Sequence, residues 1–191
     1  MAIRKVGEGV TAWTNKMFFP KDKYTIRCIE EESGTSKGDN PMITRTWEII
    51  APETIQVGDR TLSVGGLKVT QYRPTKVRNA PADVEAHGEW DSEKSDKSFN
   101  TFTDELKNAG VDVPAEIDDE TPPCLMKDVT VAAVLHSKED KARKSPTPEQ
   151  MKKGQKVGDP ILDENGKEIK TYQLQLDSIL YPVTTETNRA F

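Results

Sequence analysis

The segment Thr171–Leu180 constrains the fold more than any other part of the chain, because apolar and polar residues alternate along it almost without interruption. In one-letter code it reads TYQLQLDSIL, with Tyr172, Leu174 and Leu176 on one face and polar residues between them. Successive side chains of a β-strand point to opposite faces, so a period of two is typical of a strand that buries one face. The chain is therefore expected to build a sheet with one side against a core.

Four other segments have the composition of strands: Tyr24–Glu30, Met42–Ile50, Thr61–Tyr72 and Leu125–Leu135. They are rich in β-branched, aromatic and other apolar residues, and turn-forming residues separate them. Together with Thr171–Leu180 they predict a sheet of five strands.

Two of these segments place cations and an aromatic ring on the outer face of the sheet. In the first, Arg27 falls opposite to Tyr24 and its apolar neighbours. In the third, paired glycines at 65–66 predict a tight hairpin, a bulge or a sharp bend. Beyond them, Lys68 and Tyr72 fall on the face opposite to Val69. We expect Arg27, Lys68 and Tyr72 to point to solvent.

One helix is predicted between the third and fourth strands, over Ser98–Ala109. Ser98 is the expected N-cap, and Gly110 has the position of a glycine that ends a helix. Phe102 and Leu106, four residues apart, share one helical face.

The order strand, strand, bent strand, helix, strand, strand is the connectivity of the OB-fold, a partly open barrel whose sheet face and loops bind oligonucleotides and oligosaccharides. We therefore predict a mainly β protein: a five-stranded OB-fold barrel with one helix between strands three and four and long loops. Residues 1–191 are expected to form a single domain, with a long basic loop or small hairpin at 138–170 and a C-terminal tail at 182–191.

Composition indicates a lean core and a heavily solvated surface, with 34% hydrophobic and 31% charged residues. No apolar run approaches the roughly 18 residues of a membrane helix, and the N-terminus has no apolar signal region. Cys28 and Cys124 are expected to be small buried residues, without a disulfide, in a reducing compartment. The expected location is the cytoplasm, with no membrane partner.

Residue patterns for catalysis and metal binding are missing from the sequence. His87 and His136 have no zinc-like spacing with the two cysteines, and no phosphate-binding or dinucleotide-binding glycine motif occurs. The acidic stretch Asp163–Glu168 lacks the alternating ligands of a calcium loop and is expected to be a polar turn. We expect no enzyme activity, no cofactor and no metal.

Charge is distributed unevenly along the chain. Residues 136–156 carry seven basic and three acidic side chains, whereas residues 83–120 carry three basic and 13 acidic ones, a net charge of −10. The basic stretch contains prolines and has no apolar period, which predicts a flexible positive flap. A charge run of this kind is also compatible with an ordinary solvated surface.

A positive flap beside a sheet face suits single-stranded nucleic acid, because cations neutralise phosphates and aromatic rings stack on bases. We expect cations and rings to gather on one side of the sheet, with acidic residues segregated elsewhere. The predicted binding residues on the sheet and its first loop are Arg27, Lys37, Arg45, Trp47, Lys68, Tyr72 and Arg73, and those on the flap are Lys138, Lys141, Arg143, Lys144, Lys152 and Lys153.

Trp47 has two interpretations. It shares a face with Ile43, Arg45 and Ile49, which favours a place in the core or at the barrel rim, whereas an outward ring would stack on a base.

Much of the chain resembles a known family. The stretch KYTIRCIEEESGTSKGDNPMITRTWEII, followed by a glycine-containing third strand and by LMKDVTVAAVLHSKED, is similar to the OB-fold single-stranded DNA-binding proteins of tailed bacteriophages. The resemblance covers about residues 20–180, and its motifs are short. It implies a protein of DNA replication or recombination that coats exposed DNA without sequence preference. It assigns binding roles to Lys37, in the loop Ser36–Asn40, and to Arg27, Lys68 and Tyr72.

The C-terminus departs from this family. Many members end in an acidic tail with a terminal Phe that recruits replication partners, whereas this chain ends in TTETNRAF, in which Glu186 is the one acidic residue. Recruitment of replication or recombination proteins through the tail stays open, and so does the oligomeric state. The predicted function is binding and protecting single-stranded DNA, in the host cytoplasm if the protein is phage-encoded. The alternative is a protein-interaction or structural module, such as a component of virion assembly.

Overall fold

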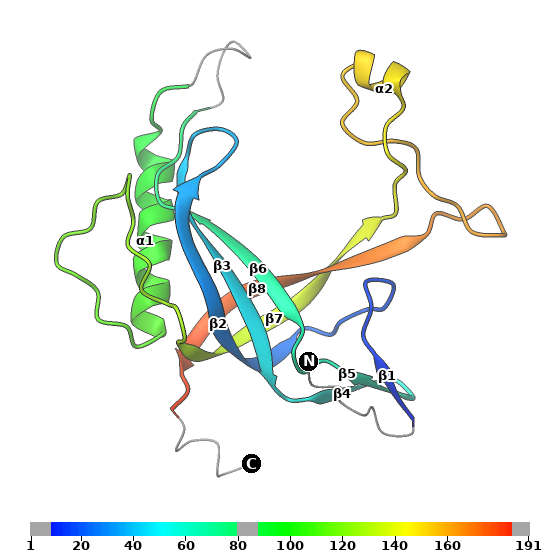
Figure 1. Cartoon of the computed structure of the whole chain (residues 1–191), viewed down its shortest axis with the longest axis horizontal. Coiled ribbons are helices and arrows are strands. Elements are labelled where there is room, and N and C mark those ends of the chain that lie inside the picture. Colours follow the sequence, from blue (N-terminus) through cyan, green and yellow to red (C-terminus); the bar gives the residue numbers. More distant parts are fainter. Residues whose placement is uncertain (1–8, 80–87, 185–191) are drawn as a thin grey trace.

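The protein is described here by a computed structural model that places residues 9–79 and 88–184 (Figure 1). His87 and most of the predicted tail at 182–191, including Glu186, lie outside the described residues.

The main sheet has five antiparallel strands in the order β6-β3-β2-β7-β8. In chain order these strands are β2 (Asp22–Thr35), β3 (Pro41–Ala51), β6 (Lys68–Pro74), β7 (Thr130–Lys141) and β8 (Lys170–Pro182). The prediction of a mainly β protein is confirmed.

The edge strands of this sheet, β6 and β8, curl toward each other without pairing. Some of their Cα atoms come within 8 Å, but no strand ladder joins them. The sheet therefore does not close into a barrel, and each edge strand keeps one side of its backbone outside the ladder.

A second, smaller sheet has the order β1-β5-β4. Its strands are β1 (Val10–Ala12), β4 (Thr54–Val57) and β5 (Arg60–Ser63). The predicted interruption at Gly65–Gly66 is confirmed, but the two parts do not form one bent strand: a turn at 64–67 separates β5 from β6, which lie in different sheets. Gly66 has a φ of +83° in this turn, a conformation that glycine adopts without steric cost.

Helix α1 (Ser92–Asn108) packs against β6 and β8 (Figure 1). The predicted start at Ser98 is wrong: Asp91 is the N-cap, and its carboxylate accepts a hydrogen bond from the Lys94 N–H (3.0 Å). The hydroxyl of Ser98 instead donates to the Pro74 carbonyl (2.6 Å). The predicted end is confirmed, since Gly110 follows the helix with a φ of +70°.

The core is formed by the inward side chains of the main sheet together with α1 and the small sheet. The predicted faces of β2 are confirmed, because Tyr24, Ile26 and Cys28 are buried and Arg27 is exposed. A bulge between Cys28 and Glu30 then shifts the alternation by one residue. As a result Glu31 points into the core, a change of phase that a regular period of two does not predict.

Beyond the sheet, β7 and β8 continue as a two-stranded ribbon that extends away from the core (Figure 1). The predicted strand Leu125–Leu135 is shifted, since β7 begins at Thr130 and reaches Lys141. The ribbon ends in residues 142–169, called here the distal lobe, which contains the short helix α2 (Pro148–Lys152). In place of an irregular flap, the lobe has its own backbone hydrogen bonds, such as that from the Ile161 N–H to the Ala142 carbonyl (2.8 Å).

The two cysteines form no disulfide, as predicted, but they differ in exposure. Cys28 is buried, and desolvation together with the nearby Glu31 charge raises the pKa of its thiol to about 12. The prediction of a buried Cys124 is wrong: this residue lies in the loop before β7 and is exposed.

We therefore expect a thiol reagent to modify Cys124 in the folded protein and to leave Cys28 unmodified until the chain unfolds, because the thiolate is the reactive form. Mass spectrometry after labelling with and without urea measures this, and Cys124→Ser is the control that should take up no label when folded. Labelling of Cys28 at the same rate with and without urea would contradict its burial in the core.

Candidate nucleic-acid interface

The outer face of β6 carries a cation and an exposed ring. Lys68 and Tyr72 point to solvent, with Tyr72 64% exposed, while Val69 and Gln71 are buried. The predicted division of this strand into two faces is confirmed. An exposed ring near a cation offers a surface on which a base can stack.

A groove of about 630 Å³, called here the β6–β8 groove, lies along the open seam of the sheet. Residues Lys68–Thr70 and Tyr72 form one wall, Thr171–Gln175 of β8 form the other, and Trp13 and Asn15 complete the lining with Asp140. The groove thus brings together rings from three parts of the chain, those of Trp13, Tyr72 and Tyr172.

Contacts within the segment before β2 hold the groove lining in place. The indole N–H of Trp13 donates to the Met17 carbonyl (3.0 Å), and its ring meets the buried Phe19 edge-on with 5.8 Å between centroids. The Tyr172 N–H donates to the Asn15 carbonyl (2.6 Å). The lining is therefore preorganised, which lowers the entropy cost of binding a ligand there.

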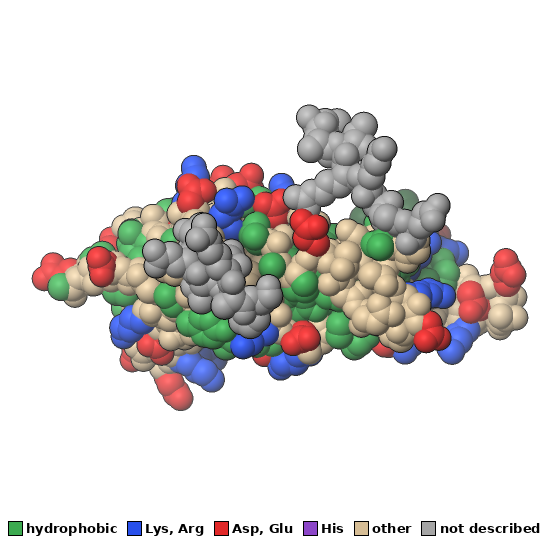
Figure 2. Space-filling model, turned by 90° about the horizontal axis from the view of Figure 1, so that it is seen from below, with side chains coloured by type: hydrophobic (Ala, Val, Ile, Leu, Met, Phe, Trp, Pro, Cys, Tyr) green, Lys and Arg blue, Asp and Glu red, His purple; other side chains and the backbone are tan. Residues whose placement is uncertain are grey.

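Arg27 lies on the same outer face, in a row with Glu48 of β3 and Lys68 of β6. Its guanidinium is 4.0 Å from the Glu48 carboxylate. The expectation of a sheet face without acidic residues is therefore wrong at this row. Lys and Arg side chains are likewise interspersed with Asp and Glu on the face shown in Figure 2.

Arg45 and Trp47 cannot serve as surface binding residues, because both are fully buried (0% exposed). The prediction that they contact nucleic acid is wrong, and the core interpretation of Trp47 is confirmed. Its indole N–H donates to the side-chain oxygen of Gln71 (3.1 Å).

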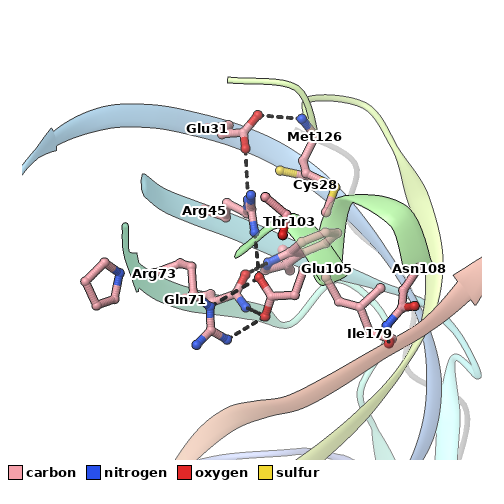
Figure 3. A network of polar contacts seen from close by, with 12 residues as sticks. Cys28, Glu31, Arg45, Gln71, Arg73, Thr103, Glu105, Asn108, Met126 and Ile179 are labelled. Atoms are coloured by element: carbon pink, nitrogen blue, oxygen red, sulfur yellow. Dashed lines mark hydrogen bonds and ion pairs between the residues drawn. The ribbon is translucent and has the colours of Figure 1, made fainter. Parts of the chain in front are cut away.

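Arg45 is the centre of a buried ion network (Figure 3). Its Nε donates to Glu31 (2.8 Å) and its Nη1 to Glu105 of α1 (2.9 Å). Glu31 also accepts from the Met126 N–H (2.6 Å), and Glu105 accepts from the Gln71 side chain (2.9 Å). The network therefore joins α1 to β2, β3 and β6 through charged groups that water does not reach.

Arg73 is also drawn into this network. Its Nε donates to Glu105 (3.2 Å), its Nη2 contacts the other oxygen of the same carboxylate, and its side chain is only 24% exposed (Figure 3). The Arg73 guanidinium is therefore already paired with a carboxylate, and a phosphate would have to compete with Glu105 for it. Sequence alternation alone does not reveal a partner that comes from a distant helix.

Lys37 lies in the tight turn between β2 and β3 and is exposed. The turn is closed by hydrogen bonds from the Ser36 N–H to the Asn40 carbonyl (2.9 Å) and from the Arg78 N–H to the Asn40 side chain (2.8 Å). Lys37 does not line the β6–β8 groove, so it would contact only a strand that continues past the end of β6.

The basic residues of the ribbon and the distal lobe are spread over a long distance. Lys138 is exposed opposite Gln173, which lines the groove. Lys141 pairs with Glu168. The other predicted lobe residues, Arg143, Lys144, Lys152 and Lys153, are exposed, and none of them lines the β6–β8 groove.

Of the residues that line the groove, only Lys68 and Tyr72 were predicted as binding residues; Trp13, Tyr172 and Gln173 are among those that were not. The alternation of Thr171–Leu180 predicted that Tyr172 points inward. It did not show that the first part of β8 extends past the core, so that Tyr172 lines a groove there. Nothing in the sequence places Trp13 beside β8.

Within residues 9–79 and 88–184, no group of three or more His, Cys, Asp or Glu side chains is arranged to hold a metal ion. The Asp163 carboxylate accepts hydrogen bonds from the Asn165 and Lys167 N–H groups (both 2.9 Å), as in a polar turn. Among the same residues, no helix is long and apolar enough to cross a membrane.

Comparison with protein-family models, with curated proteins and with solved structures finds no match to this chain.

The buried network yields a prediction about stability. Arg45→Met would leave the Glu31 and Glu105 carboxylates buried without their central cation, and breaking a buried pair in this way costs about 3–5 kcal/mol. We expect a large fall in the urea midpoint, measured by fluorescence. The matched control is Arg27→Met, which removes an exposed arginine from the neighbouring strand and is expected to change the free energy of unfolding by about 0.5 kcal/mol or less. Equal midpoints for the two variants would contradict the network.

Proposed function

We propose that the protein binds single-stranded DNA in the β6–β8 groove and that the main sheet is of the OB type. Numbered in chain order, the five strands of that sheet lie in the spatial order 3-2-1-4-5, with α1 between the third and fourth. This order supports an OB-type arrangement opened between strands three and five. OB-folds bind oligonucleotides with the face of their second and third strands and with the loops that join strands one to two and four to five, and Lys68 and Tyr72 lie on the third strand.

The observation that carries the proposal is the meeting of rings and a cation in one groove. Tyr72 offers an exposed ring on which a base can stack, and Lys68 lies on the same face of β6. Bases in a duplex are already stacked on their neighbours, so an open ring surface favours unpaired strands. Because every base has such a ring face, stacking also accounts for binding without sequence preference.

The cations near the groove determine the affinity for a DNA strand and the dependence of that affinity on salt. Lys68 in the groove and Lys138 beside it are the cations placed to reach a strand, and Asp140 and Glu48 lie close to them in the sheet. Each phosphate contact on a single strand adds about 0.7 to the magnitude of the slope of log K against log salt concentration. We therefore expect weaker salt dependence than the basic stretch at 136–156 suggests on its own.

A second candidate function is supported by the unpaired sheet edges. The groove runs between two edge strands, and an extended peptide can add to such an edge through backbone hydrogen bonds. This is the alternative of a protein-interaction or structural module. It predicts that backbone pairing, and not Tyr72, decides affinity.

The biological setting belongs to the same proposal. Binding without sequence preference suits the protection of exposed strands during DNA replication or recombination, and the family resemblance favours a bacteriophage source and the host cytoplasm. Matched DNA and RNA oligonucleotides measure whether the groove distinguishes the two, since they differ in the 2′-hydroxyl.

Tyr72→Ala tests the stacking ring. Loss of one base–ring stack costs about 1–3 kcal/mol, which corresponds to an affinity for oligo(dT) lower by about 5- to 150-fold. Fluorescence anisotropy with a labelled oligonucleotide measures this. Tyr181→Ala is the matched control, because Tyr181 is 47% exposed on β8 outside the groove. Equal affinities for the two variants would exclude stacking on Tyr72 and favour the peptide alternative.

Lys68→Ala tests the phosphate contact. We expect the slope of log K against log salt to become shallower by about 0.7, the value for one contact on a single strand. The control is Lys97→Ala, which removes an exposed lysine of α1 on another part of the surface. An unchanged slope with Lys68→Ala would mean that no phosphate lies at this wall of the groove.

A further inference from the structure

The distal lobe presents an apolar side chain among cations. Met151 of α2 is 56% exposed, and Lys152 and Lys153 follow it directly. The ion pairs of the ribbon, Lys141–Glu168 and Lys170–Glu139, stop short of these lysines. An exposed apolar residue beside several cations has the character of a contact surface for an acidic, partly apolar partner.

A surface of the opposite character lies beside α1. A groove of about 580 Å³, called here the α1 groove, separates the helix from residues 113–118. Its apolar lining comes from Phe99, Val113, Pro114 and Ile117. Glu116 and Asp118 add two acidic side chains, and Lys107 adds one basic side chain, which is paired with Asp104 (3.6 Å). Asp112, just before this loop, is exposed as well.

The two surfaces lie on opposite sides of the main sheet. In Figure 1, α1 with its following loop stands at one side of the sheet, and α2 stands at the far end of the β7–β8 ribbon. A single molecule in this conformation therefore cannot bring its own lobe into its own groove. Two copies can, and each dimer then still has one unoccupied lobe and one unoccupied groove.

We propose that the distal lobe of one copy docks in the α1 groove of a second copy, with Met151 against the apolar wall and Lys152 and Lys153 facing Asp112 and Glu116. The lobe and the groove have opposite charges around an apolar centre, and this favours the distal lobe as the occupant of the α1 groove. The contact joins two different surfaces, so it is heterologous and does not close on itself. Copies add head to tail in an open row.

This inference goes beyond the binding of DNA. It assigns the basic residues of the distal lobe to protein contact, where the sequence predicted phosphate contact. A lobe that enters a small groove buries little surface area, as in the small interfaces of transient protein complexes. Self-association is therefore expected to rise with protein concentration and to weaken with salt, since exposed charges are screened.

Sedimentation velocity of the full chain, without nucleic acid and at low salt, tests the proposal. We expect the average mass to rise with concentration for the natural sequence. Lys152→Glu with Lys153→Glu alters the lobe, and Asp112→Lys with Glu116→Lys alters the groove. Each double variant should stay monomeric, because like charges then face each other across the contact.

Mixing the two double variants distinguishes this interface from other forms of association. The natural lobe of the groove variant fits the natural groove of the lobe variant, and the acidic lobe of the lobe variant fits the basic groove of the groove variant. Each variant alone should therefore stay monomeric, whereas the mixture should form longer assemblies of alternating copies. Combining all four substitutions in one chain restores opposite charges and should restore longer assemblies. Lys97→Glu with Lys138→Glu changes the charge equally at other sites and should associate as the natural sequence does.

Two outcomes would overturn the proposal: a natural chain that is monomeric at every concentration, or lobe and groove variants that associate as it does. Circular dichroism confirms that each variant is folded. Affinity for an oligonucleotide too short to hold two copies is measured separately, and we expect the lobe variant to bind it as the natural sequence does. Failure of the interface and failure of DNA binding are therefore separate results.

Discussion

The buried ion network around Arg45 is the interaction on which the rest of the structure depends. Arg45 is fully buried between Glu31 and Glu105, so its charge is matched by carboxylates from β2 and from α1. A buried charge without its partner costs several kcal/mol, so an arrangement of helix and sheet that separates these groups is disfavoured. We infer that the network favours a single register between α1 and the strands more than it adds to net stability.

The same network shapes the candidate interface. Through Glu105 it holds Gln71 and Arg73, which lie on the face of β6 opposite to Lys68 and Tyr72. The core holds the buried face of β6 through Val69 and Gln71, while one edge of the strand stays unpaired opposite β8. A groove lined with rings follows from that open seam. In the proposed function the groove binds by base stacking supported by few cations, in contrast to the strong electrostatic attraction of a wholly basic surface.

Local patterns in the sequence predicted the features that depend only on neighbouring residues, such as the face of a strand on which a side chain lies. The alternation in β2 and β6 placed Arg27, Lys68 and Tyr72 outside correctly, because a period of two is a property of the strand itself. The inward turn of Glu31 was missed, because a bulge of one residue shifts the phase and leaves no clear local signal. The partners of Arg45 and Arg73 were missed for another reason: Glu105 lies on a helix far along the chain, and only the folded structure brings it under the sheet. The β6–β8 groove was missed for the same reason: it is formed by two strands and by the segment before β2, which are far apart in the sequence.

The most direct test of the central claim is to locate the bound strand on the protein surface. A single-stranded oligonucleotide that carries a photoreactive thymine analogue would be bound to the full chain, irradiated and mapped by mass spectrometry after proteolysis. Binding in the β6–β8 groove predicts cross-links in the peptides that contain Tyr72, Tyr172 or Trp13. Cross-links confined to the distal lobe or to α1, or labelling no different from that of a denatured control, would contradict it.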